Sequence, residues 1–191
     1  VSYEITDNAL NRKQFANEGH FFTFKAKFLS ALETSIPGTT AQFDSTVRKQ
    51  HDWLNLNVEG QYYFLTLPRL HFGFHGKAML NSQSLFANYT ASLLSMPTLN
   101  VIPDLETYFF KEYRSPQFVG GGLNTIFTIK KKIDLRIDAF LYQPFIQVIQ
   151  NTDGTLELSQ PFNGGAFMAS ASSIFSESTE LLVRHCTLYF P

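Results

Sequence analysis

Two pairs of ionisable side chains stand four residues apart in this 191-residue chain and suggest shared chemistry. His71 and His75 could ligate one metal ion, and Asp134 and Asp138 could act as a general acid and a general base. Both pairs lie where apolar and polar residues alternate, which predicts β-strands. Four residues of strand span about 13 Å, too far for one metal ion or one reacting atom. We therefore expect no metal site and no acid–base pair, and Arg136 between the aspartates favours a ladder of ion pairs.

Motifs for nucleophilic catalysis and phosphate binding are missing from the sequence. No Gly-x-Ser-x-Gly occurs, so a serine hydrolase elbow is not indicated. Three consecutive glycines at 120–122 are followed by no Lys-Ser or Lys-Thr, and such glycines in a strand allow curvature or close packing. Serine or asparagine occurs near His20 and His51, but no arrangement of neighbours in the sequence supports a catalytic Ser-His pair. The sequence predicts a protein that is not an enzyme and holds no cofactor.

The elements that carry these residues are long strands with two different faces. Around Leu56, for example, the apolar residues Leu54 and Val58 alternate with Asn55 and Asn57. Strands of this kind are predicted over residues 20–32, 52–65, 70–80, 117–129, 133–148 and 162–175, with a seventh over 179–190. Most exceed the roughly 9–11 residues that a tilted strand needs to cross a bilayer. The pattern predicts an all-β, antiparallel transmembrane β-barrel or barrel segment of about 7–8 strands.

The polar faces of these strands would line the water-filled interior of the barrel, which removes the cost of burying charges. The residues assigned to this lumen are Lys25, Lys27, Asn55, Asn57, Glu59, Gln61, His71, His75, Lys77, Asn124, Asp134, Arg136 and Asp138. Tight turns would place Glu59 opposite His75 and bring Asn124 close to Asp138.

The predicted connections alternate in length, as in outer-membrane barrels. Residues 66–69, 130–132 and 176–178 form short turns, whereas 33–51, 81–116 and 149–161 form long outer loops. Residues 84–95 carry apolar residues at helical spacing and predict a short helix, with an irregular loop as the alternative. Residues 106–113 resemble a strand but are assigned to the loop, and residues 1–5 alternate but are too few to span a bilayer.

Composition supports a membrane strand protein and argues against other classes. Charged residues make up only 16% of the chain, below the roughly 25% of ordinary proteins, and aromatic residues reach 15%. A net charge of −1 gives no basic surface for nucleic acid. Cys186 is the only cysteine, so no disulfide can form within the chain. An aromatic-rich soluble β-sandwich remains the alternative.

Several motifs, taken in order along the chain, resemble a known family. They are Gly19-His20-Phe21-Phe22, Ile36-Pro37-Gly38-Thr39-Thr40, Gln61-Tyr62-Tyr63-Phe64, Leu67-Pro68-Arg69-Leu70-His71-Phe72-Gly73-Phe74, Asn88-Tyr89-Thr90 and Phe118-Val119-Gly120-Gly121-Gly122-Leu123. From about residue 19 to 175 the chain resembles the C-terminal barrel of bacterial patatin-like phospholipases. That barrel belongs to the surface-antigen superfamily, which includes the outer-membrane insertases.

The resemblance implies a fold, a location and partners, with two departures. Family enzymes use a serine in a Gly-x-Ser-x-Gly elbow with an Asp partner, and no Gly-x-Ser-x-Gly occurs here. Family barrels also have more strands and end in an alternating strand with a terminal aromatic residue, whereas this chain ends in Leu188-Tyr189-Phe190-Pro191 after an atypical stretch. We expect residues 1–191 to form a single barrel domain in the outer membrane of a Gram-negative bacterium, as the C-terminal part of a longer chain. Its partners would be membrane lipids and an upstream domain or other outer-membrane subunits.

Three functions are compatible with the sequence. The first is an outer-membrane barrel that anchors, or forms a lipid or polypeptide conduit for, an upstream patatin-like domain. The second is a self-contained small pore or structural barrel. The third is a soluble β-barrel that binds an apolar ligand.

Overall fold

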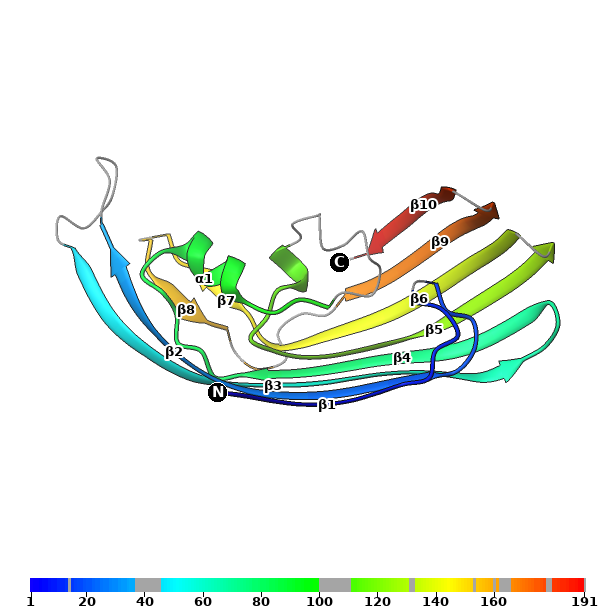
Figure 1. The fold of residues 1–191 in the computed structure, drawn as a ribbon. Coiled ribbons are helices and arrows are strands. Elements are labelled where there is room, and N and C mark those ends of the chain that lie inside the picture. Colours follow the sequence, from blue (N-terminus) through cyan, green and yellow to red (C-terminus); the bar gives the residue numbers. More distant parts are fainter. Residues whose placement is uncertain are drawn as a thin grey trace.

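A curved antiparallel sheet forms most of the protein in the computed structural model (Figure 1). The structure describes residues 1–13, 15–36, 46–99, 111–130, 133–152, 154–159, 161, 166–177 and 180–190. Within these residues no helix is long and apolar enough to cross a membrane.

Eight strands form the sheet in the order β1-β2-β3-β4-β5-β6-β9-β10, and every neighbouring pair is antiparallel. Their bounds are β1 Ser2–Asn8, β2 His20–Ser35, β3 Val47–Thr66, β4 Leu70–Asn81, β5 Gln117–Lys130, β6 Ile133–Ile146, β9 Ala166–Glu177 and β10 Glu180–Phe190. A separate hairpin pairs β7 Val148–Gln150 with β8 Leu156–Leu158. The predicted all-β antiparallel fold is thus confirmed.

The strand predictions differ from the structure mainly in extent. β1 is a full strand of seven residues paired with β2, whereas the sequence analysis set residues 1–5 aside as too short. β2 and β3 continue into the predicted long loop as far as Ser35 and Val47, because their ladder of hydrogen bonds persists there. The predicted strand over 133–148 ends at Ile146, and the loop over 149–161 contains part of the β7–β8 hairpin. The turns at 131–132 and 178–179 lie outside the described residues.

The predicted helix is present but shorter than expected. α1 spans Tyr89–Ser95, and the Asn88 side chain caps it by accepting a hydrogen bond from the backbone N–H of Ala91 at 3.2 Å. A 3-10 helix, η2, spans Lys111–Tyr113. The rest of the strand-like segment at 106–113 lies outside the described residues.

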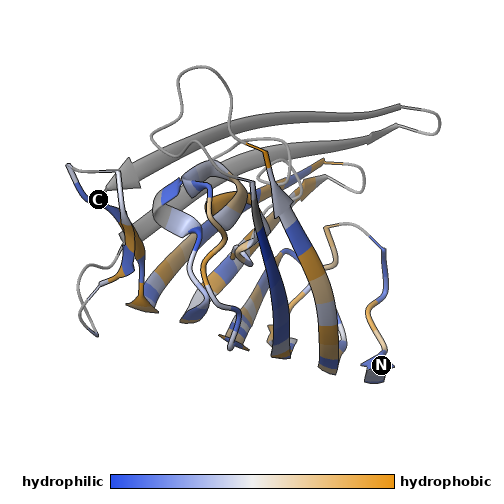
Figure 2. Cartoon of the chain, turned by 90° about the vertical axis from the view of Figure 1, so that its left-hand side faces the viewer, coloured by the Kyte–Doolittle hydropathy of each residue, from blue (hydrophilic) through white to orange (hydrophobic). Residues whose placement is uncertain are grey.

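The sheet is open within the described residues, with β1 and β10 as its edge strands. Figure 2, viewed along the strands, shows them side by side in an arc, and α1 lies on the hollow side of that arc. Of the two predicted forms, a barrel or a barrel segment, no closed barrel is therefore seen in this part of the chain. The described strands instead form an open, curved sheet.

The two faces of the arc differ in what covers them. We call the face under α1, η2 and residues 9–19 the inner face, and the opposite face the outer face (Figure 1). Two apolar clusters attach the covering segments to the inner face. One contains Met79, Leu99, Tyr113, Phe118, Phe140 and Tyr142, and the other contains Ala16, Tyr63 and Ile126 with Leu10 against it. The core thus lies on the inner side of the sheet.

Two glycines of β5 make room for this packing. A Cβ atom at Gly120 would stand 2.7 Å from the Leu99 side chain, and one at Gly122 would stand 2.2 Å from the ring of Phe140. Any larger residue would displace its neighbour. The glycine run therefore serves close packing, as the sequence analysis inferred.

Candidate functional site: the polar inner face

All thirteen residues predicted to face the lumen lie on the inner face. The strand registers place them together, for instance through the Cα partners Lys25 and Asn57, and Asn124 and Asp138. Their burial differs along the sheet. His71, His75, Asn124, Asp134, Arg136 and Asp138 are buried, Lys27 is exposed, and Lys25, Asn55, Asn57, Glu59, Gln61 and Lys77 are half-buried.

The most buried charges form the predicted ladder on β5 and β6. The Arg136 Nε donates to both carboxylate oxygens of Asp138, at 2.9 and 2.8 Å, and Asn124 Nδ2 donates to one of them at 2.6 Å. The expected approach of Asn124 to Asp138 is confirmed, because the two are direct cross-strand partners. In this structure neighbouring protein groups satisfy these charges.

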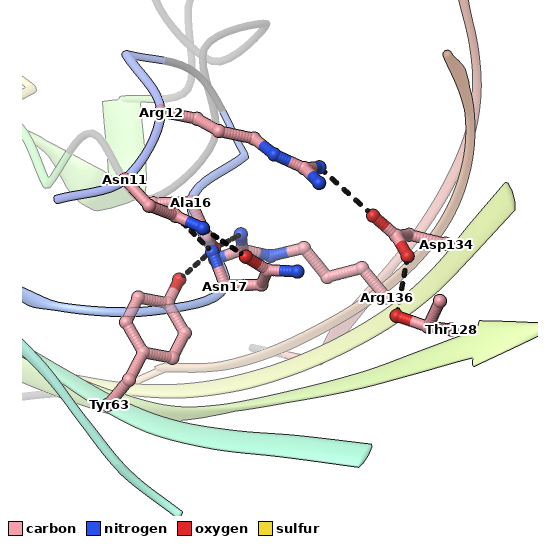
Figure 3. A network of polar contacts seen from close by, with 8 residues as sticks. All are labelled: Asn11, Arg12, Ala16, Asn17, Tyr63, Thr128, Asp134 and Arg136. Atoms are coloured by element: carbon pink, nitrogen blue, oxygen red, sulfur yellow. Dashed lines mark hydrogen bonds and ion pairs between the residues drawn. The ribbon is translucent and has the colours of Figure 1, made fainter. Parts of the chain in front are cut away.

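The segment over residues 9–19 supplies part of that satisfaction (Figure 3). Arg12 forms an ion pair with Asp134 at 3.1 Å, and Thr128 donates to the same carboxylate at 2.7 Å. The carbonyl of Ala16 accepts hydrogen bonds from the Tyr63 hydroxyl and from Arg136 Nη1. Sequence analysis did not find these contacts, because residues 9–19 have no strand periodicity and reach β6 only through the fold.

The path of this segment depends on Gly19. Its φ of +97° is in the region that favours glycine, and a Cβ there would stand 2.1 Å from the carbonyl oxygen of Ala9. The backbone N–H of Ala9 donates to the carbonyl of His20, and that of Tyr63 donates to the carbonyl of Gly19. The segment thus leaves β1, covers β5 and β6, and returns to start β2.

A second charged cluster links β3 and β4. Glu59 accepts from His75 Nε2 at 3.2 Å and pairs with Lys77 at 3.5 Å. The predicted placement of Glu59 directly opposite His75 is wrong, because Lys77 is its Cα partner and His75 stands opposite Gln61. A bulge between Tyr63 and Leu65 follows in the same ladder, and the hairpin register is not that of a simple tight turn. Diagonal side-chain contact still joins the two residues.

A cavity of about 510 Å³ opens between the sheet and the stretch that leads into α1. We call it the lysine cavity. Its lining residues are Lys25, Lys27 and Leu29 of β2, Trp53, Asn55 and Asn57 of β3, Met79 and Asn81 of β4, and Gln83, Phe86 and Ser95. Four of these residues, Lys25, Lys27, Asn55 and Asn57, are among the predicted lumen residues. No sequence pattern singled out the other lining residues as members of a site; they only lie in or near the predicted strands.

A third polar chain joins residues that no sequence pattern connects. His51 on β3 contacts Glu33 on β2 through Nε2 at 2.8 Å and Ser84 through Nδ1 at 2.6 Å. Glu33 also accepts from the backbone N–H of Ala87 at 2.8 Å. The residue types match those of a serine hydrolase triad, but the ring is reversed, since the serine of such a triad bonds Nε2 and its acid bonds Nδ1. Ser84 is not among the residues that line the lysine cavity.

No metal centre is indicated in the described part of the chain, where no group of three or more His, Cys, Asp and Glu residues is placed to hold an ion. Comparison with known proteins identifies no family for this chain. No family model, no curated protein and no solved structure matches this chain.

Proposed function

We propose that the chain is a wall segment of a membrane-spanning β-barrel in a bacterial outer membrane, where it anchors an upstream domain or contributes to a lipid or polypeptide conduit. One observation carries this proposal. Large apolar side chains are exposed on the outer face of six neighbouring strands, while the thirteen polar residues predicted for the lumen lie on the inner face.

The apolar residues of the outer face form a continuous surface. The large ones exposed on it are Tyr3 and Ile5 of β1, Phe22, Phe28 and Leu32 of β2, Leu54, Val58, Tyr62 and Phe64 of β3, Phe74 and Leu80 of β4, Val119, Leu123 and Phe127 of β5, and Ile137 and Leu141 of β6. Soluble monomers rarely expose apolar patches of more than a few hundred Å². Lipid acyl chains fit such a face, because they need no hydrogen bonds and cover it without a protein partner.

Aromatic residues of the outer face gather toward one end of the sheet. Tyr62 and Phe74 are Cα partners, Phe127 stands opposite Leu70, and the rings of Phe64 and Phe72 stack at 6.4 Å. All lie toward the short connection between β3 and β4, over residues 67–69. Membrane barrels carry aromatic girdles at the level of the lipid headgroups. In the proposed arrangement this end of the sheet lies at one membrane interface.

The inner face supports a filled interior for this wall. Residues 9–19 lie over β5 and β6 and are held by buried hydrogen bonds to Tyr63 and Arg136. A conduit along this part of the face would require the segment to move. An anchor would not, so the structure favours the anchoring role.

An enzymatic role is not part of the proposal. The His51 ring has the reverse orientation to a hydrolase triad, and its two partners tie the stretch before α1 to the sheet. We assign Glu33, His51 and Ser84 a structural role at the β4–α1 connection. A catalytic domain upstream, as the family resemblance implies, would be recognised by a Gly-x-Ser-x-Gly in the preceding reading frame.

Arginine substitution at two equally exposed leucines tests the outer face. Leu123 on the outer face and Leu94 on α1 are each 55% exposed. In water, arginine at either position would change stability by no more than about 0.5 kcal/mol. In a bilayer, Leu123→Arg should cost about 2–4 kcal/mol near the midplane, and Leu94→Arg should remain near zero.

The measurement is the free energy of unfolding in urea after refolding into phosphatidylcholine vesicles, with heat modifiability on gels to report the folded form. Wild-type protein should require detergent or lipid to remain monodisperse. Equal effects of the two arginines, or a monodisperse wild-type monomer without detergent, would refute the membrane proposal and favour a soluble apolar-ligand protein.

A further inference from the structure

We infer that the lysine cavity binds a phosphate group that carries neighbouring hydroxyl groups, as phosphoglycerol headgroups and sugar phosphates do. The cavity lies on the inner face, so this inference does not rest on the proposed membrane role. Its volume of about 510 Å³ is within the range of small-molecule sites.

The charge of the lining selects an anion. Lys25 and Lys27 both line the cavity, and none of the lining residues is acidic. Lys25 forms an ion pair at 2.9 Å with Glu4 of β1, which does not line the cavity. Lys27 makes no ion pair within the described part of the chain. The two lysines are separated by one residue on the same strand face, about 7 Å apart at Cα, so their long side chains can converge on one phosphate.

Two amides add hydrogen-bonding capacity beside the lysines. Asn55 and Asn57 are the Cα partners of Lys27 and Lys25, and neither side chain makes a hydrogen bond to another described residue. The Oδ1 atom of Asn57 is buried and has no partner. An unsatisfied buried acceptor is costly, and a ligand hydroxyl would satisfy it while the amide N–H groups donate to phosphate oxygens.

The remaining wall is fixed and partly apolar. Asn81 donates to Gln83 at 3.4 Å, and Gln83 donates to Ser95 at 2.9 Å, so these polar groups already satisfy one another. Leu29, Trp53, Met79 and Phe86 supply apolar surface in the same cavity. This surface suits the carbon skeleton of an organic phosphate better than the bare inorganic ion.

Trp53 allows binding to be measured directly, because it is the only tryptophan of the chain and lines the cavity. The full chain, refolded in a non-ionic detergent at constant concentration, is titrated with glycerol 1-phosphate, inorganic phosphate, dihexanoyl phosphatidylglycerol and glycerol. Saturable change in Trp53 emission is expected with glycerol 1-phosphate, at lower concentration than with inorganic phosphate, and none with glycerol. If dihexanoyl phosphatidylglycerol binds more tightly than glycerol 1-phosphate, the natural ligand is a lipid headgroup. If the lipid binds equally or more weakly, the natural ligand is a free organic phosphate.

Variants locate the site. Lys27→Met should weaken glycerol 1-phosphate by about 10-fold or more, because it removes a charged partner of the phosphate. Asn57→Leu should weaken the binding of glycerol 1-phosphate more than that of inorganic phosphate, since only glycerol 1-phosphate has alcohol hydroxyl groups beside the phosphate. Lys77→Met is the matched control, a lysine of the inner face outside the cavity. Far-UV circular dichroism shows whether each variant is folded. Absence of saturable binding to any phosphate, or equal effects of Lys27→Met and Lys77→Met, would overturn the inference.

Discussion

Asp138→Ala tests whether the buried polar ladder holds β5, β6 and residues 9–19 together. The side chains of Arg136 and Asp138 are only 9% and 6% exposed. The substitution removes the carboxylate that pairs with Arg136 and accepts from Asn124. The Arg136 guanidinium would keep its hydrogen bond to the carbonyl of Ala16 at 3.3 Å, but it would lose its carboxylate partner.

The expected magnitude follows from these contacts. The two Arg136 bonds share one Nε–H and count as one interaction, so two hydrogen bonds to a charged group are lost, at about 1.5–3 kcal/mol each. Breaking a buried ion pair by removing one partner costs about 3–5 kcal/mol. The two estimates agree, and we expect the free energy of unfolding to fall by about 3–5 kcal/mol.

The assay is urea unfolding in non-ionic micelles, followed by Trp53 fluorescence, with the slope checked against the wild type. Asp7→Ala is the control, since Asp7 pairs with His20 at 3.3 Å at the surface and should lose no more than about 1 kcal/mol. The double variant Arg136→Met with Asp138→Leu should lose less than Asp138→Ala alone, because no unpaired charge stays buried. A loss below about 1 kcal/mol for Asp138→Ala would refute the reasoning, as it would mean that water already solvates the pair.

Two further predictions concern packing and chemistry. Gly122→Ala should lower stability by about 1–3 kcal/mol, because its Cβ would stand 2.2 Å from Phe140 and 2.3 Å from the Ala139 carbonyl oxygen. Gly121→Ala, whose Cβ would meet its nearest atom at 3.3 Å, should cost clearly less in the same urea titration, and equal costs would contradict the packing argument. Ser84 should not be labelled by a fluorophosphonate probe, because its imidazole partner is reversed relative to a hydrolase triad. Labelling that is lost in Ser84→Ala but kept in Ser82→Ala would show that Ser84 is an activated nucleophile and would contradict its structural role.

The sequence by itself determined the faces of the strands. Side chains alternate with a period of two along any strand, so Leu56 and Asn57 must point to opposite sides whatever the fold. Near Asp138 the sequence also determined a pairing. The β5–β6 ladder is regular from the pair Phe118 and Pro144 to the pair Thr128 and Asp134, and it brings Asn124 directly opposite Asp138.

Tertiary structure decided the register wherever a ladder is irregular. Glu59 meets Lys77 as its Cα partner and reaches His75 only diagonally. Periodicity states which face a residue occupies, but the residue opposite depends on turn length and on bulges such as the one after Tyr63.

Only the fold could reveal the contacts between distant segments. Arg12 is 122 residues from Asp134, and His51 joins Glu33 and Ser84 from three different parts of the chain. No local pattern encodes such contacts, because they depend on where a non-periodic segment returns to the sheet. The lysine cavity has the same origin, since Phe86 and Ser95 close it only when the stretch before and within α1 lies over β2 and β3. The sequence thus determines which residues share a face, through the geometry of the strand, whereas curvature and chain return decide which of them meet.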